Sequence, residues 1–226
     1  AYPGGGLCLS DSGTSNSYMI YPNPGVFYFD ATVKGNSFEP LDGIPYDAEV
    51  LWETRNGKKT VSAGDIISQV GVVSDMVFFK TPEDVVPGNA LIAVKDENGT
   101  ILWSWHIWVV DYVPASENQT YYSGAVMMDR NLGATVPTPD YNNLDASWKP
   151  AAGAIYQWGR KDPIIHETVS VQHSWFYSVE ESVQNPALFA AGGDYWLNPM
   201  DEYLWRPDSK TMYDPCPAGW RVSPKS

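Results

Sequence analysis

The first half of the chain alternates between apolar and polar residues with a period of two, the pattern of half-buried β-strands. After the turn sequence Asn23-Pro24-Gly25, Phe27 and Phe29 fall on one face and Tyr28 and Asp30 on the other. The same alternation predicts further strands at residues 47–53, 70–73, 76–80, 89–95 and 101–112. No helical period interrupts them, so we expect residues 1–112 to form an antiparallel β-sandwich of immunoglobulin-like or related type.

The strand predicted at residues 101–112 is apolar on both faces. It follows an Asn98-Gly99 hairpin signal and places Trp103 and Trp105 on one face and Trp108 on the other. A strand with two apolar faces has to be covered on both sides. We therefore predict that Trp105 packs inside the sandwich and that Trp108 contacts the second half of the chain.

The pattern changes after residue 112. We interpret residues 113–123 as a connector and residues 124–226 as a loop-rich α+β domain. Short strands are predicted at 125–128 and 154–158, and a long Pro- and Asn-rich surface loop at 136–150. A helix is predicted from a Ser178 cap to about Asn185, where Pro186 ends it, with Glu180 and Glu181 near its positive end.

Composition narrows the classes of function. The 226 residues include 10 Trp and 14 Tyr, and 27 acidic against 14 basic residues give a net charge of −13. Such a chain is repelled by phosphate, which argues against nucleic-acid and anionic-membrane partners. No apolar stretch reaches the roughly 18 residues of a membrane helix. The first residues are typical of a mature terminus or of a cut made within a longer chain.

Three motifs in the second half carry a family resemblance. They are Met128-Asp129-Arg130-Asn131-Leu132-Gly133-Ala134, then Tyr156-Gln157-Trp158-Gly159-Arg160-Lys161-Asp162-Pro163, then Asp214-Pro215-Cys216-Pro217-Ala218-Gly219-Trp220-Arg221-Val222. In this order they resemble the Fibrobacter succinogenes major paralogous domain of Bacteroidetes surface proteins. Residues 31–36, 48–53, 88–95 and 101–109 resemble the module that often precedes that domain in gut Bacteroides proteins.

The resemblance implies an exported cell-surface or outer-membrane protein, lipid-anchored through a removed N-terminal segment and adhesin-like or fimbrillin-associated. It implies no known activity. It also implies a second fold distantly similar to C-type lectins and formylglycine-generating enzymes. Because the family pattern usually continues beyond Gly219-Trp220-Arg221-Val222, we expect either that the second domain is truncated near residue 226 or that its last segment is absent from the numbered chain.

No residue pattern points to catalysis. The three histidines, His106, His166 and His173, have no metal-binding spacing, and no nucleophile motif is present. Formylglycine generation needs active cysteines, whereas the second half contains only Cys216. We therefore predict no catalytic residue, no cofactor and no enzyme.

Loop aromatics are the main binding candidates. Trp148, Trp175, Trp196 and Trp205 lie in Pro-, Gly- and Asn-rich segments, where exposed indole rings stack on sugars or anchor protein interfaces. The alternative is that these rings fill small irregular cores. Trp158 and Trp220 lie within the motifs and are expected to be core residues.

Two further candidates concern metals and cysteines. Asp140, Asn142 and Asp145, with Asn143, form an oxygen-rich segment of the kind that binds calcium. It lacks the glycine and ligand spacing of a calcium loop, so we favour a plain Asx turn. Cys8 and Cys216 could pair in an exported protein, although two free thiols are favoured.

The leading hypothesis is a non-catalytic adhesion or pilus-associated protein that binds a protein or glycan at the cell surface. The first alternative is a carbohydrate-binding module of a surface glycan system. The second is an enzyme of the formylglycine-generating type.

Overall fold

The computed structural model describes residues 5–56, 58–59, 63–165 and 170–223, and it is mainly β, with 32% strand and 8% helix. This confirms the predicted class. One larger sheet has the order β1 (Leu7–Cys8), β3 (Val26–Asp30), β7 (Met76–Lys80), β6 (Gln69–Val73). The other has the order β2 (Ser17–Ile20), β9 (Ile101–Val109), β8 (Gly88–Lys95), β4 (Asp47–Arg55), β5 (Lys58–Lys59). A 3-10 turn, η1 (Leu9–Ser12), follows β1.

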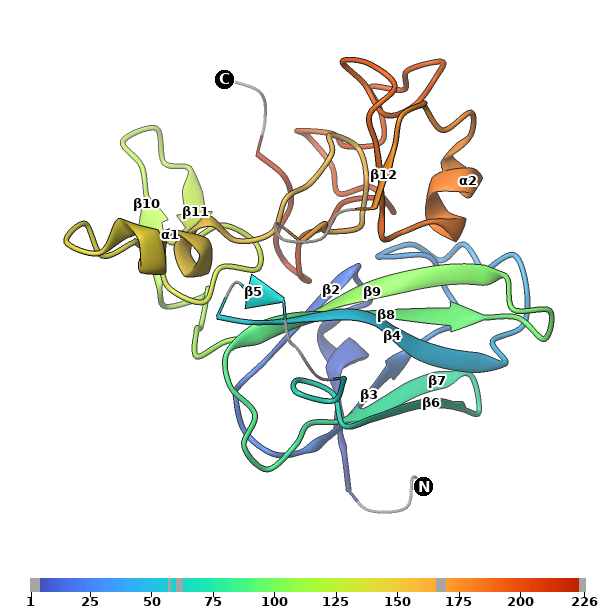
Figure 1. Cartoon of the computed structure of the whole chain (residues 1–226), viewed down its shortest axis with the longest axis horizontal. Helices are drawn as coiled ribbons and strands as arrows, with labels where there is room; N and C mark the ends of the chain where they lie inside the picture. Colours follow the sequence, from blue (N-terminus) through green and yellow to red (C-terminus); the bar gives the residue numbers. More distant parts are fainter. Residues whose placement is uncertain (1–4, 57, 60–62, 166–169, 224–226) are drawn as a thin grey trace.

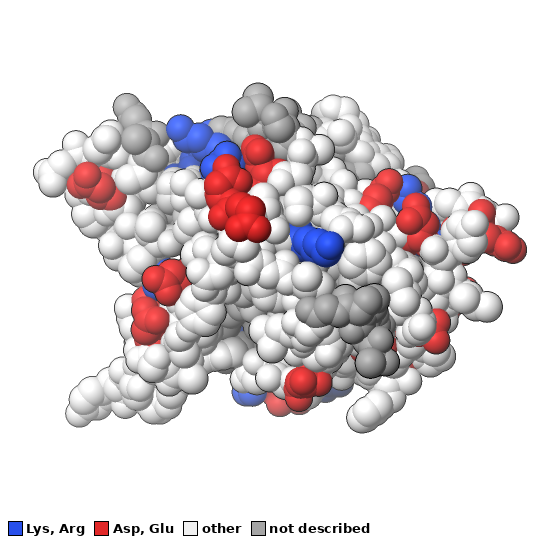
Figure 2. Space-filling model, turned by 90° about the horizontal axis from the view of Figure 1, so that it is seen from below, with Lys and Arg blue, Asp and Glu red and all other residues white. Residues whose placement is uncertain are grey.

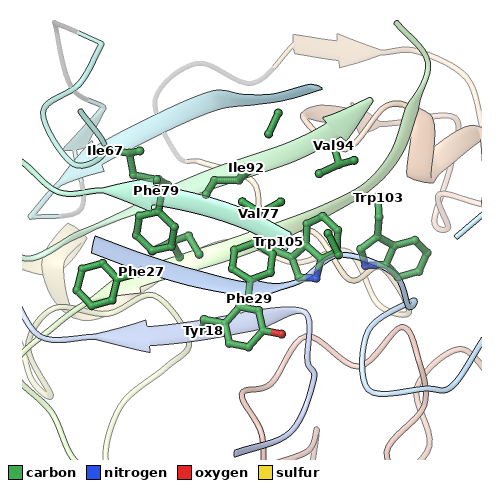
Figure 3. Packing of buried hydrophobic residues seen from close by; sticks show 14 of the residues in the cluster. Tyr18, Phe27, Phe29, Ile67, Val77, Phe79, Ile92, Val94, Trp103 and Trp105 are labelled. Atoms are coloured by element: carbon green, nitrogen blue, oxygen red, sulfur yellow. The ribbon is translucent and has the colours of Figure 1, made fainter. Parts of the chain in front are cut away.

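The two larger sheets pack face to face through one aromatic core (Figure 3). The ring of Phe29 on β3 lies 5.1 Å from that of Trp105 on β9, and Phe27 stacks on Phe79 at 5.2 Å. Trp105 is almost completely buried, as the alternation in the sequence predicted. These side chains come from alternate positions of their strands, so one face of each sheet supplies the core.

The larger sheets are mixed, and the expectation of a purely antiparallel arrangement is wrong at two pairs of strands. β2 pairs parallel with β9, with Ser17 opposite His106, and β1 pairs parallel with β3. Both added strands are short and lie at a sheet edge. β1 has only two residues and the burial along β2 does not alternate, so no period of two marked either strand in the sequence.

The second half of the chain lies over the outer face of the β2–β9–β8 sheet (Figure 1). Its elements are β10 (Asn118–Thr120), β11 (Val126–Met128), α1 (Leu144–Ala152), β12 (Ser170–Gln172), α2 (Val179–Gln184) and β13 (Leu188–Ala190). β10 pairs antiparallel with β11 and β12 parallel with β13, each as a separate two-stranded sheet. Few regular elements are present, and loops make up most of this half.

Helix α2 confirms the predicted helix and its cap. Ser178 Oγ accepts a hydrogen bond from the Glu181 amide at 3.1 Å, and Glu181 Oε2 accepts one from the Tyr177 amide at 2.8 Å. Both bonds satisfy amides that would otherwise lack partners at the start of a helix. The helix ends at Gln184, and its C-cap Asn185 directly precedes Pro186.

Three predictions for the second half are wrong in detail. The segment 136–150, expected to be a loop, contains most of helix α1, because Pro150 falls in its last turn and the residues before it are good helix formers. The segment 154–158 forms only a single bridge, from Ile155 to Ile164. The segment 113–123, expected to be a connector, contains β10.

Candidate functional site

A network of buried polar side chains joins the two halves, and we call it the seam. Ser104, on the outer face of β9, donates a hydrogen bond to Asp162 Oδ1 at 2.6 Å. Lys161 Nζ donates to the same carboxylate oxygen at 2.6 Å and to the Ser104 carbonyl at 3.0 Å. All three residues are buried. Burial lowers the pKa of Lys161, and the charge of Asp162 opposes that shift.

His106 lies at the centre of the seam. Its Nε2 is 2.8 Å from Asn89 Oδ1, and the Asn89 amide nitrogen donates to the Gly133 carbonyl at 2.9 Å. Since Asn89 Oδ1 can only accept, His106 Nε2 is the donor. Complete burial lowers the pKa of His106 to about 3, so the ring is neutral in the folded protein.

The other ring nitrogen of His106 faces two hydroxyls. Its Nδ1 is 3.2 Å from Ser17 Oγ and 3.4 Å from the Tyr156 hydroxyl, and Ser17 Oγ donates to the Pro215 carbonyl at 2.6 Å. Burial raises the pKa of Tyr156 well above its ordinary range. Neutral hydrogen-bonding groups therefore connect four distant positions of the sequence: Ser17, His106, Tyr156 and Pro215.

These residue types would suit acid–base chemistry, but the seam is closed to ligands. The cavity beside it is lined by Trp52, Asn89 and Gly133 among others and has a volume of about 10 Å³, which is room for no more than one water. In the described structure, the seam therefore holds the two halves of the chain together and leaves no room for a ligand.

Trp108 confirms the predicted contact between the two halves. Its side chain is fully buried, packs near Met128 and Leu132, and donates from Nε1 to the Ala134 carbonyl at 3.1 Å. The outer face of β9 is thus covered by the second half of the chain.

The second half also contains an open cavity of about 170 Å³. Its lining residues are Trp158, Glu202, Trp205, Arg206, Pro207, Val222 and Ser223. The rings of Trp158 and Trp205 meet edge to face at 5.1 Å, and the charged Glu202 and Arg206 are exposed. The cavity is smaller than the roughly 300–1,000 Å³ of pockets for drug-sized ligands, so it could admit a single small ring.

The four tryptophans proposed as ligand contacts do not form one site. Trp196 is only 2% exposed and donates from Nε1 to the Trp158 carbonyl at 2.6 Å, so its assignment as a ligand contact is wrong. Its indole fills a small core against Phe176 instead. Trp205 is 7% exposed and lines the cavity.

The remaining two lie far apart. Trp148 is 41% exposed on α1, whereas Trp175 follows β12 and is half-buried beside Gly192 and Gly193. Figure 1 shows α1 and β12 at different ends of the second half. Trp158 and Trp220, expected in the core, are only half-buried.

A group of exposed apolar side chains, of which the sequence analysis singled out only Trp148, lies at the end of the molecule that carries β10, β11 and α1, on the left in Figure 1. We call it the aromatic end. It comprises Tyr121, Tyr122, Val126 and Met127 of the β10–β11 hairpin and Tyr141, Leu144 and Trp148 of the α1 segment, all exposed. The sequence feature that could have indicated the hairpin part of this end is the uncharged run 118–128, between Glu117 and Asp129.

The proposed calcium ligands form a turn. Asp140 Oδ1 accepts a hydrogen bond from the Asn142 amide at 2.9 Å, which is the geometry of an Asx turn. The Asp145 side chain and His166 lie outside the described residues. Within the described parts of the chain, no cluster of three His, Cys, Asp or Glu residues could hold a metal ion.

Both cysteines are free thiols, and the structure contains no bridge between Cys8 and Cys216. Cys8 is half-buried with its sulfur 3.5 Å from Ser10 Oγ. Cys216 is buried, and its amide donates to Asp214 Oδ1 at 2.8 Å. Burial raises the pKa of the Cys216 thiol, so it is protonated at neutral pH.

Comparison with known proteins gave no match, either to a family model, to a curated protein or to a solved structure. Among the described residues, no helix has both the length and the apolar character needed to cross a membrane.

Proposed function

We propose that this chain is a non-catalytic protein of the bacterial cell surface that acts by binding, as an adhesion or pilus-associated component. The exposed aromatic end carries this proposal. Large apolar side chains gathered on the surface of a soluble domain are typical of interaction sites. The net charge of −13 keeps the protein in solution, and exposed apolar side chains add nothing to that effect.

The three motifs of the second half add support, because they resemble a domain of exported Bacteroidetes surface proteins. We propose that the chain is exported and is lipid-anchored at the outer membrane through a removed leader. We also propose that the two larger sheets form an immunoglobulin-like or related β-sandwich and that the second half is distantly similar to C-type lectins. The core shared between Phe29 and Trp105 supports the first of these assignments.

Adhesion can be tested with beads coated with the purified protein and passed under flow over immobilised extracellular-matrix proteins or mucin. Wild-type beads should be retained on one of these surfaces. Replacing two exposed side chains of the α1 segment, Tyr141→Ser with Trp148→Ser, should reduce retention by about tenfold.

The control is Tyr177→Ser, since the exposed fraction of Tyr177, 66%, lies between those of Tyr141 and Trp148, 76% and 41%, but Tyr177 lies beside α2. Retention that is absent for the wild type, or that is reduced equally by the control, would refute the proposal.

A second candidate function is carbohydrate binding, favoured by the cavity at Trp158 and Trp205. Aromatic rings next to a carboxylate and a guanidinium supply the stacking surface and hydrogen bonds that recognise a sugar. The double variant Glu202→Ala with Arg206→Ala changes only exposed side chains and should abolish binding on a glycan array. The double variant Lys80→Ala with Glu83→Ala, which also leaves the net charge unchanged, should bind as the wild type does. A wild-type protein that binds no glycan would exclude this function.

A further inference from the structure

The β10–β11 hairpin is an isolated two-stranded sheet. Each of its strands pairs with the other and with no further described strand. All residues from 119 to 127 are exposed, so both faces of the hairpin are open to solvent. An isolated two-stranded hairpin is marginally stable in water, and further pairing or packing would stabilise it.

The open edge of β11 offers backbone groups for pairing. The Tyr121 amide donates to the Ala125 carbonyl at 2.8 Å, so the backbone groups of residue 125 point toward β10. The register, with Gln119 opposite Met127, places the backbone groups of residue 127 on the same side. By the alternation of an antiparallel ladder, the N–H and C=O of Val126 point outward. Natural proteins usually protect such an edge with Lys, Pro or a covering segment, and residues 118–128 contain neither Lys nor Pro.

The base of the hairpin is held in a fixed position. Arg130, two residues beyond β11, donates to both carboxylate oxygens of Asp129, at 2.7 and 3.1 Å, and lies 3.9 Å from the centre of the Tyr112 ring. The Asp129 amide bonds the Tyr112 hydroxyl at 3.2 Å. The exposed strands are therefore presented from a pre-organised base, which lowers the entropy cost of binding.

Charge identifies the kind of partner. No charged residue occurs from 118 to 128, although the chain carries a net charge of −13. Figure 2 shows an uncharged projection at the lower left, at the end of the molecule that carries β10 and β11 in Figure 1. A basic partner would need carboxylates to pair with, and the hairpin has none. A second copy of the chain would bring the same uncharged surface, so contact there desolvates no charge.

Self-pairing also suits the geometry of an edge. An antiparallel edge strand is complementary to itself across a two-fold axis, so one surface serves both subunits. The exposed Tyr122, Val126 and Met127 would then be buried together with the paired edges.

We propose that the β10–β11 hairpin is the surface through which two copies of this chain associate, by antiparallel pairing of their β11 edges. This inference rests on the proposed function, in which the aromatic end is a binding surface. It adds that the partner of the hairpin is a second copy of the chain. Because each copy of the chain carries a net charge of −13, added salt should strengthen the dimer by screening the repulsion between the two copies. Added salt would instead weaken a contact between opposite charges.

Analytical ultracentrifugation of the wild-type protein over a range of concentrations, at low and high sodium chloride, tests the proposal. The expected result is a monomer–dimer equilibrium that shifts toward dimer in high salt. Val126→Lys and Val126→Pro should each raise the dissociation constant by about tenfold or more. The first adds a charge at the edge, and the second removes the outward N–H without removing a bond within the hairpin.

The matched control is Ile44→Lys, an equal change of charge at an exposed apolar residue of the first half. A wild-type protein that stays monomeric at about 100 µM, or a dimer that Ile44→Lys weakens as much as Val126→Lys does, would overturn the proposal. So would a monomer that co-sediments with neutral phosphatidylcholine vesicles through Tyr122, since the occupant would then be lipid.

The outcome separates this inference from the proposed function. A monomer whose coated beads still adhere would refute only the dimer. A dimer without adhesion would refute only the adhesion proposal.

Discussion

The indole Nε1 of Trp108 donates a hydrogen bond to the backbone carbonyl of Ala134 across the junction between the two halves of the chain, at 3.1 Å. Both residues are fully buried. The bond links the outer face of β9 to the turn that follows β11, and so makes the second half a cover for the first.

Trp108→Phe should therefore destabilise the protein. Phenylalanine keeps most of the ring but leaves the Ala134 carbonyl buried without a donor, at a cost of roughly 1–3 kcal/mol in the free energy of unfolding. Chemical denaturation measures the change. Trp148→Phe, at an exposed position, should change the free energy by less than about 0.5 kcal/mol, and equal effects of the two variants would contradict the structural role of Trp108.

The neutral His106 should make stability depend on pH. In the unfolded chain the ordinary pKa of histidine is about 6.5, whereas burial lowers the pKa of His106 in the folded protein to about 3. Between these values the unfolded chain binds one more proton. The contribution of the neutral, buried His106 to the free energy of unfolding is therefore fully present above about pH 6.5 and is lost as the pH falls toward 3.

The variant His106→Gln isolates this effect, because every other titrating group is shared with the wild type. Between about pH 5.5 and 4 the free energy of unfolding of the wild type should fall more steeply than that of the variant, by about 1.4 kcal/mol per pH unit. Denaturant titrations at several pH values give both curves. Parallel curves would show that His106 is not buried in its neutral form.

Lys161 and Asp162 should behave as a coupled pair. Asp162→Asn leaves the buried ammonium of Lys161 without its counter-ion and should cost about 3–5 kcal/mol. Lys161→Met in the same chain removes the unpaired charge, so the double variant should be more stable than the sum of the two single changes predicts. A double-mutant cycle by chemical denaturation measures the coupling, and additive effects would exclude an energetic link between the two side chains.

Arg160 should fix the end of α2. Its guanidinium donates to the carbonyl of Leu188 at 2.6 Å and to that of Asn185 at 3.1 Å. Arg160→Lys keeps a positive charge but loses the forked geometry, at a cost of roughly 1–3 kcal/mol. Faster amide hydrogen exchange in α2 and β13 would identify where the loss acts. The exposed Arg206→Lys serves as the control, and unchanged exchange in Arg160→Lys would refute the role.

Local signals in the sequence determined the regular parts of this protein. Alternation from Phe27 to Asp30 and along residues 101–109 marked β3 and β9, because successive side chains of a strand point to opposite faces. Ser178 marked the start of α2 as its N-cap, and Pro186, which has no backbone N–H to donate, marked its end. The two apolar faces of β9 also indicated that Trp108 would need a cover, since an apolar face is not left in water.

Tertiary structure alone decided which distant residues meet. The parallel pairing of β2 with β9 and the contact of Ser17 with His106 join positions 89 residues apart, and such contacts leave no period in the chain. The same holds for the burial of Trp196 against Phe176 and the exposure of Tyr122 at the hairpin tip. A tryptophan or tyrosine in a loop has the same local sequence whether it is covered or exposed, because its surroundings come from other parts of the fold.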